Sequence, residues 1–149
     1  MLRLSKRIEY GLMAMQYLAL SPAGASVSVR EIAQRQGLPY ELLAKIMQQL
    51  ARRGLVRSRQ GLKGGYQLAK PLQAITLKEL AGALGQELSL VACESGGRRC
   101  SLYARCSLRH PLMRLEARLD RLFGQIPLSE FLLPPVTEPQ ITSQRSPYE

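Results

Sequence analysis

The sequence of 149 residues is poor in the side chains that most often carry acid–base and nucleophilic catalysis. It has a single histidine, His110, and three cysteines, and all four lie between residues 93 and 110. No nucleophile–histidine–acid set is apparent, because the one histidine sits among the cysteines. The glycine-rich segment 61–65 lacks the Gly-Lys-Ser/Thr ending of a phosphate-binding loop. We therefore expect that the protein is not an enzyme and has no small-molecule substrate.

Long apolar runs are absent as well. No segment approaches the roughly 20 apolar residues that a membrane-spanning helix needs, and the opening MLRLSKRIEYGL has no signal-peptide core ending at a cleavage site. The cysteines are odd in number and lie in one short stretch, which argues against a secreted disulfide framework. We expect a soluble, cytoplasmic protein with no membrane partner.

The net charge of +10 is unevenly distributed along the chain. Residues 1–71 hold twelve Lys and Arg against three acids, a net of +9, whereas residues 72–149 hold nine against eight, a net of +1. Ordinary solubilising charge would not favour one half so strongly. A basic half predicts a polyanionic partner, and we expect double-stranded DNA because no basic amphipathic segment ends the chain.

Apolar spacing and capping residues predict two helices at the start of the chain. Residues 6–20 place apolar side chains at helical spacing. Ser28 is followed three residues later by Glu31, the pattern of a capping box in which each side chain bonds the other's backbone. The helix that follows should stop at Gly37.

A further helix is predicted over residues 39–53, with Pro39 suited to its first turn and Gly54 closing it. One face of this helix is apolar: Leu42, Leu43, Ile46, Met47 and Leu50. Two short helices joined by a turn are typical of a helix-turn-helix, although many small helical pairs share the pattern. Residues 55–58 and 66–69 then read as two strands of a basic hairpin or wing.

These elements give a set of expected DNA contacts. The helix over residues 39–53 would lie in the major groove, where Glu41 accepts from a cytosine amino group and Lys45 and Gln48 reach purine edges. The wing cations would hold phosphates, and the wing glycines would let the backbone approach them. The full predicted set is Ser28, Pro39, Tyr40, Glu41, Lys45, Gln48, Arg59, Lys63, Gly64 and Gly65. A plain surface hairpin with incidental charge is the alternative for the wing.

The segment CESGGRRCSLYARCSLRH, residues 93–110, contains the soft and borderline ligands of the chain. Cys93, Cys100, Cys106 and His110 suit iron, an iron–sulfur cluster or zinc. Gly96 and Gly97 would let the loop fold tightly, and neighbouring arginines would favour thiolates and offset a cluster's negative charge. Structural zinc, a metal-free thiol redox switch and three unrelated thiols remain alternatives.

The stretch GLVRSRQGLKGGYQLAKP, followed by AITLKEL, resembles the wing and next helix of the iron–sulfur cluster regulators of the IscR and NsrR type. The opening LRLSKRIEYGL, the clustered cysteines and the following long helix fit the same family, so the resemblance covers about residues 2–133. It implies a mainly α fold with a small β-hairpin wing, a winged helix-turn-helix domain and a long dimerisation helix. It also implies a transcription regulator, repressor or activator, that binds inverted-repeat operators as a homodimer and holds a cluster, with [2Fe-2S] favoured and [4Fe-4S] possible.

Three thiolates leave a fourth ligand to be found. In the histidine-ligated members of the family, the histidine lies three residues after the last cysteine, where this chain has Arg109 and His110 comes one residue later. Glu9 matches the place from which related regulators supply a carboxylate from the partner subunit. Its alternative is a solvated helix residue paired with a neighbouring cation. We rank His110 before Glu9.

The last part of the chain predicts one more helix. From Pro111 to about Gln125 the residues Leu112, Leu115, Leu119, Leu122 and Ile126 form an a/d seam, for a partner helix or for the chain's own core. The expected organisation is a DNA-binding domain over 1–85, a cluster-binding loop over 86–110, a dimerisation region over 111–133 and a flexible tail over 134–149.

Overall fold

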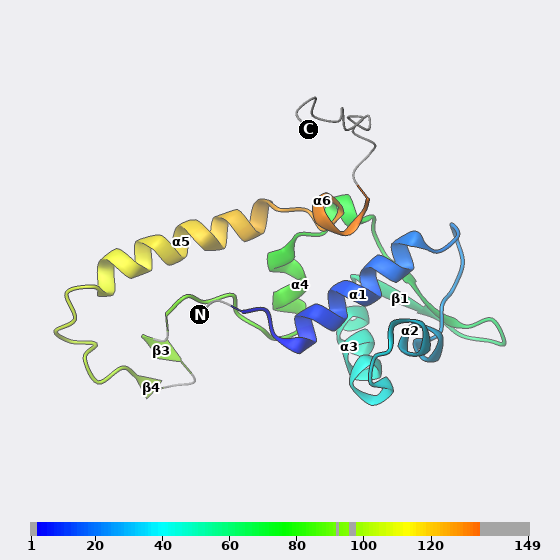
Figure 1. Ribbon diagram of the computed structural model, residues 1–149, viewed down its shortest axis with the longest axis horizontal. Helices are drawn as coiled ribbons and strands as arrows, with labels where there is room; N and C mark the ends of the chain where they lie inside the picture. The colour runs from blue at the N-terminus through cyan, green and yellow to red at the C-terminus, as the bar shows by residue number, and fades with distance from the viewer. Residues whose placement is uncertain (1–2, 92, 96–97, 135–149) are drawn as a thin grey trace, which may run out of the picture.

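The computed structural model of the protein describes residues 3–91, 93–95 and 98–134. A helical head carries one hairpin wing, and a small second hairpin is followed by a long helix that leads back to the head (Figure 1). The elements in chain order are α1 (Lys6–Leu20), α2 (Val29–Gln36), α3 (Tyr40–Arg52), β1 (Val56–Arg59), β2 (Gly65–Leu68), the 3-10 helix η1 (Leu72–Ala74), α4 (Leu77–Ala83), β3 (Glu94–Ser95), β4 (Arg98–Arg99), α5 (Arg109–Gln125) and α6 (Ser129–Leu132). Within the described ranges, no helix is both long and apolar enough to span a membrane.

The core of the head forms where α1, α3 and α4 meet. The predicted apolar stripe of α3 faces inward, with Leu43, Ile46, Met47 and Leu50 buried, whereas Leu42 is half-buried. Helix α1 contributes the same kind of face through its helical spacing: Ile8, Leu12, Met15 and Leu18. The sequence-based prediction of this mainly α fold with a small hairpin wing is confirmed.

The helix starts follow the predicted caps. The Ser28 hydroxyl accepts a hydrogen bond from the Glu31 backbone N–H at 3.1 Å, and Gly37 ends α2 in the left-handed conformation. The other half of the expected capping box, a hydrogen bond from the Ser28 backbone N–H to the Glu31 side chain, is replaced by a different contact. The Glu31 carboxylate accepts from the Tyr17 hydroxyl of α1 at 2.9 Å. This hydrogen bond raises the pKa of Tyr17 above its ordinary value.

The wing lies one residue away from its predicted bounds at both strands. β1 and β2 pair antiparallel from Val56↔Leu68 to Arg59↔Gly65. Leu55 was expected in the first strand, but it is fully buried in the core and lies before the ladder begins. Val27, in the connection between α1 and α2, adds a bridge to Tyr66, with N–H···O distances of 3.0 and 2.8 Å. The wing is therefore attached to the head on both sides.

Helix α5 begins at Arg109, two residues before the predicted start at Pro111, and ends at Gln125 as expected. Beyond it the chain returns to the head. Ile126 O accepts from Leu77 N at 3.1 Å, and Leu128 N donates to Ile75 O at 2.8 Å. Leu128 and Leu132 are buried in the head, and α6 also meets α1 where Gln16 donates to Leu132 O. Except for Pro134, the proposed tail lies outside the described residues.

Candidate nucleic-acid interface and cysteine segment

The outward face of α3 carries the side chains that were predicted to read base edges. Glu41, Lys45 and Gln48 are all exposed, because the apolar stripe on the other side of the helix holds α3 against the head. Gln49, on the flank, is instead engaged within the head, where its amide oxygen accepts from Arg7 of α1. The structure thus brings three of the predicted residues together on one polar helix face.

The start of α3 meets the start of α2. Pro39 is the N-cap residue of α3, and no side chain caps this end. The guanidinium of Arg30, on α2, lies 5.8 Å from the centre of the Tyr40 ring, which is 46% exposed. Sequence reasoning missed Arg30, because a contact between two helices leaves no local spacing pattern. An exposed cation next to an exposed phenol suits contact with a phosphate.

The wing presents its two cations to solvent. Arg59 and Lys63 are exposed, and Leu62 at the tip is fully exposed. Gly64 and Gly65 are needed for the backbone path of the wing. A Cβ on Gly64 would lie 2.6 Å from Arg59 O, and a Cβ on Gly65 would lie 2.4 Å from Val27 O. Gly65 also has a φ of +153°. Both positions are required by the wing itself, and their approach to phosphates stays a prediction.

The cysteine segment contains the second hairpin. β3 and β4 pair antiparallel, with Glu94 opposite Arg99 and Ser95 opposite Arg98, so Cys93 and Cys100 directly flank the two strands. The Cys100 N–H donates to the Cys93 carbonyl at 2.9 Å. Cys106 lies beyond this hairpin, where its carbonyl accepts from Arg109 N at 3.4 Å. All three thiols are free, and Cys100 is exposed while the other two are half-buried.

One aromatic ring organises the cations of this segment. The guanidinium carbons of Arg109 and Arg99 lie 4.6 and 5.2 Å from the centre of the Tyr103 ring. Arg109 also donates to the Tyr103 carbonyl at 3.0 Å. Sequence reasoning listed these arginines as neighbours of the thiols but missed Tyr103, whose place inside the thiol segment was its only signal. Cation–π contacts of this kind order the turn between Cys100 and Cys106.

The two candidates for a fourth ligand lie on different parts of the chain. His110 is exposed in the first turn of α5, with its Nε2 3.1 Å from an Arg109 nitrogen. Glu9 sits on α1, where it pairs with Lys6 at 2.6 Å, the arrangement of the plainer alternative. Among the described residues, no three Cys, His, Asp or Glu side chains form a metal-ligand group. The structure therefore does not assemble the five predicted ligands, and their roles stay predictions.

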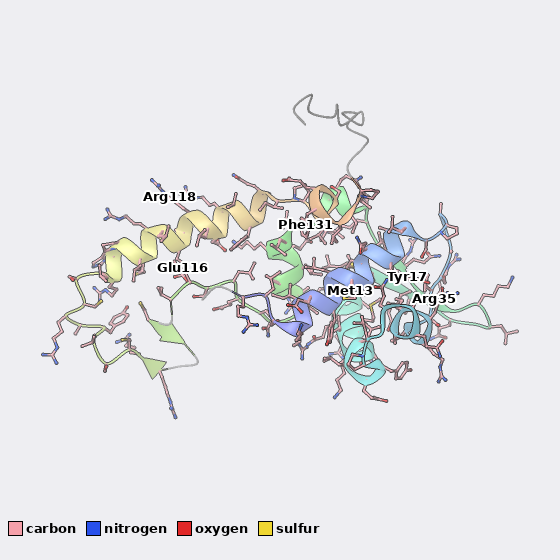
Figure 2. All side chains as sticks on the ribbon, viewed as in Figure 1. Met13, Tyr17, Arg35, Glu116, Arg118 and Phe131 are labelled. Atoms are coloured by element: carbon pink, nitrogen blue, oxygen red, sulfur yellow. The ribbon has the colours of Figure 1, made fainter. Side chains whose placement is uncertain are left out.

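A cavity of about 590 Å³ is lined by residues of both α4 and α5, and Cys93 forms part of its wall. On its α5 side, the Glu116 carboxylate accepts from Leu90 N at 3.0 Å and from the Ser89 hydroxyl. Lys78 of α4 pairs with Asp120 of α5 at 2.6 Å. Figure 2 shows Glu116 and Arg118 on opposite sides of α5. The chain entering the cysteine segment is thus tied to α5, and α5 is tied to α4.

A helix pair with an exposed polar face, followed by a cationic hairpin, defines a winged-helix DNA-binding protein. The model of the Rrf2 family, described as iron-dependent transcriptional regulators, matches residues 4–133, and the chain belongs to this family.

Relatives and solved structures agree with that assignment. An HTH-type transcriptional regulator of Aquifex aeolicus (strain VF5) is 33% identical over 121 residues, covering 80% of this chain and 83% of the relative. CymR, the global cysteine regulator of B. subtilis, superposes with a TM-score of 0.69 at 26% identity, covering 89% of this chain and 97% of CymR. IscR of T. potens does so with a TM-score of 0.67 at 26% identity, covering 88% and 86%. The protein is a DNA-binding transcriptional regulator and not an enzyme.

Proposed function

We propose that this regulator senses iron, redox state or nitric oxide through an iron–sulfur cluster bound to Cys93, Cys100 and Cys106. The observation that carries the proposal is the placement of three free thiols in one segment, two of them side by side on a hairpin. Thiolates are the protein ligands that such clusters require. The likeness to IscR and the family's description as iron-dependent are consistent with this chemistry.

The donor set fits a cluster, with one rearrangement. The Cys100 N–H donates to the Cys93 carbonyl, and Cys106 follows Cys100 after five intervening residues that include Tyr103. The segment would have to close so that Cys106 joins the other two. His110 would supply an imidazole from the same chain, whereas Glu9 would supply a carboxylate from the partner's α1. The cluster itself would supply a group that reacts with oxidants or nitric oxide, with [2Fe-2S] favoured over [4Fe-4S].

We propose further that the protein acts as a homodimer through α5. This helix of 17 residues contains no buried residue, and Leu122 is 48% exposed on the predicted seam. Leu115 and Met113 are exposed as well. An apolar seam of this length is stabilised by burial against a second helix. A two-fold dimer would present two copies of α3, so the operator would be an inverted repeat.

At each half-site, α3 would enter the major groove. Glu41 would accept from a cytosine amino group, and Lys45 and Gln48 would reach purine edges. Tyr40 with Arg30, and Arg59 with Lys63, would hold phosphates on either side. Neutralising about six phosphates per dimer predicts a loss of roughly a thousandfold in affinity between 50 and 200 mM salt.

The deciding experiment is anaerobic purification followed by iron and sulfide counts and a visible spectrum. A cluster gives iron, sulfide and broad visible absorption, and a Cys100→Ser variant should lose all three while a matched Ser101→Ala variant keeps them. If the protein binds zinc and shows no visible absorption, the segment holds a structural zinc ion and not a cluster. A metal-free protein after attempted reconstitution would leave only a thiol switch or unrelated thiols.

A further inference from the structure

We infer that, in the cluster-free protein, Cys93 and Cys100 form a reversible disulfide with each other, and that Cys106 remains a thiol. The inference concerns the chain without a cluster, so it does not depend on the cluster proposal. It assigns one oxidation site and selects two cysteines out of three. The selection comes from the β3–β4 hairpin.

The hairpin places the two cysteines on neighbouring strands at the same level. The register runs Ser95↔Arg98 and Glu94↔Arg99, so Cys93 and Cys100 are the next facing pair. The Cys100 N–H···O Cys93 bond of 2.9 Å extends the ladder to them. Facing residues of such a hydrogen-bonded pair have Cα atoms about 5.5 Å apart. Disulfides span Cα separations of roughly 4.4–6.8 Å, so this pair lies within the Cα range. Facing Cβ atoms lie about 4.5–5.5 Å apart and must close to about 4 Å for the bond to form.

Cys106 has a different environment. It follows the turn that Tyr103 and Arg109 order, and its carbonyl accepts from the Arg109 N–H at the start of α5. It is half-buried, whereas Cys100 is exposed and open to an oxidant. Joining Cys106 to either hairpin cysteine would require the segment to close, while the Cys93–Cys100 pair is already held in register.

The reaction is thiol–disulfide exchange with a low-molecular-weight disulfide such as glutathione disulfide. The Cys100 thiolate attacks one sulfur of the glutathione disulfide, which breaks the S–S bond and releases one glutathione thiolate. The Cys93 thiolate then attacks the Cys100 sulfur of the mixed disulfide and releases the second glutathione thiolate. The two released thiolates take up the two protons lost by the cysteines. Two protein thiols are oxidised, and one glutathione disulfide is reduced to two glutathione molecules.

The consequence is a block on metal uptake that a reductant reverses. A disulfide between Cys93 and Cys100 removes two of the three thiolates in the segment, because cysteine binds metals only as a thiolate. Oxidised protein would therefore accept neither a cluster nor zinc until its disulfide is reduced. This state differs from oxidation of a bound cluster, because it acts on the empty segment.

Digestion with trypsin allows each possible disulfide to be identified by mass. Cleavage after Lys78, Arg98, Arg99, Arg105 and Arg109 places the three cysteines on three separate peptides, 79–98, 100–105 and 106–109. The full-length cluster-free protein is equilibrated anaerobically with a glutathione redox buffer, alkylated, digested and analysed by mass spectrometry. We expect the 79–98/100–105 linked pair to exceed either link to 106–109 by about tenfold, because the hairpin already holds that pair within disulfide range.

Single-residue variants distinguish a specific Cys93–Cys100 disulfide from non-specific oxidation of the three thiols. Cys106→Ser should form the same link as the parent, whereas Cys93→Ser should leave Cys100 as a glutathione adduct. Far-ultraviolet circular dichroism of each variant checks that the head is folded. The inference is overturned if links to Cys106 predominate, or if all three thiols stay alkylatable in buffer poised to oxidise ordinary vicinal dithiols. Iron counts on reduced protein, measured separately, show whether the cluster proposal fails on its own.

Discussion

Replacing Gly65 by alanine tests whether the wing glycine is required by the fold itself. The new Cβ would lie 2.4 Å from Val27 O and 2.8 Å from Ser28 N, and both neighbours are backbone atoms that cannot rotate away. The φ of +153° adds strain for any L side chain. We therefore expect the Val27–Tyr66 bridge to open, so that two backbone hydrogen bonds of 3.0 and 2.8 Å are lost.

The size of the effect follows from those terms. Two hydrogen bonds contribute about 1 kcal/mol each, and an unfavourable φ costs of order 1 kcal/mol or more. The sum is about 3 kcal/mol, equivalent to a fall in melting temperature of roughly 10 °C for a chain of this size. Gly61→Ala is the matched control, because its φ of +117° is also unfavourable but its added Cβ meets nothing within 4 Å.

The assay combines thermal unfolding with amide hydrogen exchange at Val27 and Tyr66. We expect faster exchange at these two amides in Gly65→Ala than in the parent, together with the lower melting temperature. Equal melting temperatures and equal exchange for Gly65→Ala and the parent would refute it. In that case, the glycine would serve only the approach to DNA, as the sequence alone had indicated.

Four further outcomes are expected. Leu122→Ala should shift the dimer–monomer equilibrium toward monomer in analytical ultracentrifugation, and unchanged association would count against α5 as the dimer contact. Leu128→Ala removes a fully buried side chain and should lower the free energy of unfolding by about 3 kcal/mol in urea denaturation. Unchanged stability would count against the packing of Leu128 in the head. Lys63→Ala should weaken all duplexes alike and reduce the salt slope by about 2 in fluorescence anisotropy, because a dimer carries two copies of Lys63. A sequence-dependent loss would instead assign Lys63 a base contact. Glu31→Ala should return the raised Tyr17 pKa toward its ordinary value in a ¹³C NMR titration. Because a raised pKa favours the protonated folded state, the Tyr17 contribution to stability is present below about pH 10 and is lost above it; a parent whose Tyr17 titrates normally would refute this.

Features encoded by neighbouring residues were predictable from the sequence. The Ser28 cap, the left-handed Gly37 and the inward stripe of α3 each depend on spacings within one helix, and each is found. The wing was predicted one residue away on each strand. The Leu55 carbonyl still accepts from the Ala69 N–H at 3.0 Å, so these two predicted strand residues lie directly beside the ladder. Pro127 marks the break after α5, yet nothing local shows that the chain then returns to the head.

Features that join distant elements could not be predicted. Glu31 bonds Tyr17 of another helix, Arg30 stacks on Tyr40, and Glu116 holds the backbone of Leu90, 26 residues earlier. The cysteines were found as a candidate site because their residue types and spacing already indicate metal or redox chemistry. Their pairing was beyond the sequence, because the β3–β4 register, and not the spacing alone, makes Cys93 and Cys100 neighbours.

Under the proposed sensing function, α5 would connect a change among the cysteines to the DNA-reading head. In the middle of α5, the Glu116 carboxylate accepts from the backbone of the chain that enters the cysteine segment. After α5, the segment Ile126–Leu128 forms backbone hydrogen bonds with Ile75 and Leu77, the neighbours of the α4 N-cap residue Thr76. The Glu116 carboxylate accepts two hydrogen bonds, which at a partly solvated site contribute about 1 kcal/mol each. A switch that alters DNA affinity by thirty- to a hundredfold needs only about 2–3 kcal/mol of difference between two arrangements. Release of this one anchor would therefore be of the right size to bias α5, and the buried Leu128 just beyond α5 joins this end of the chain to the head.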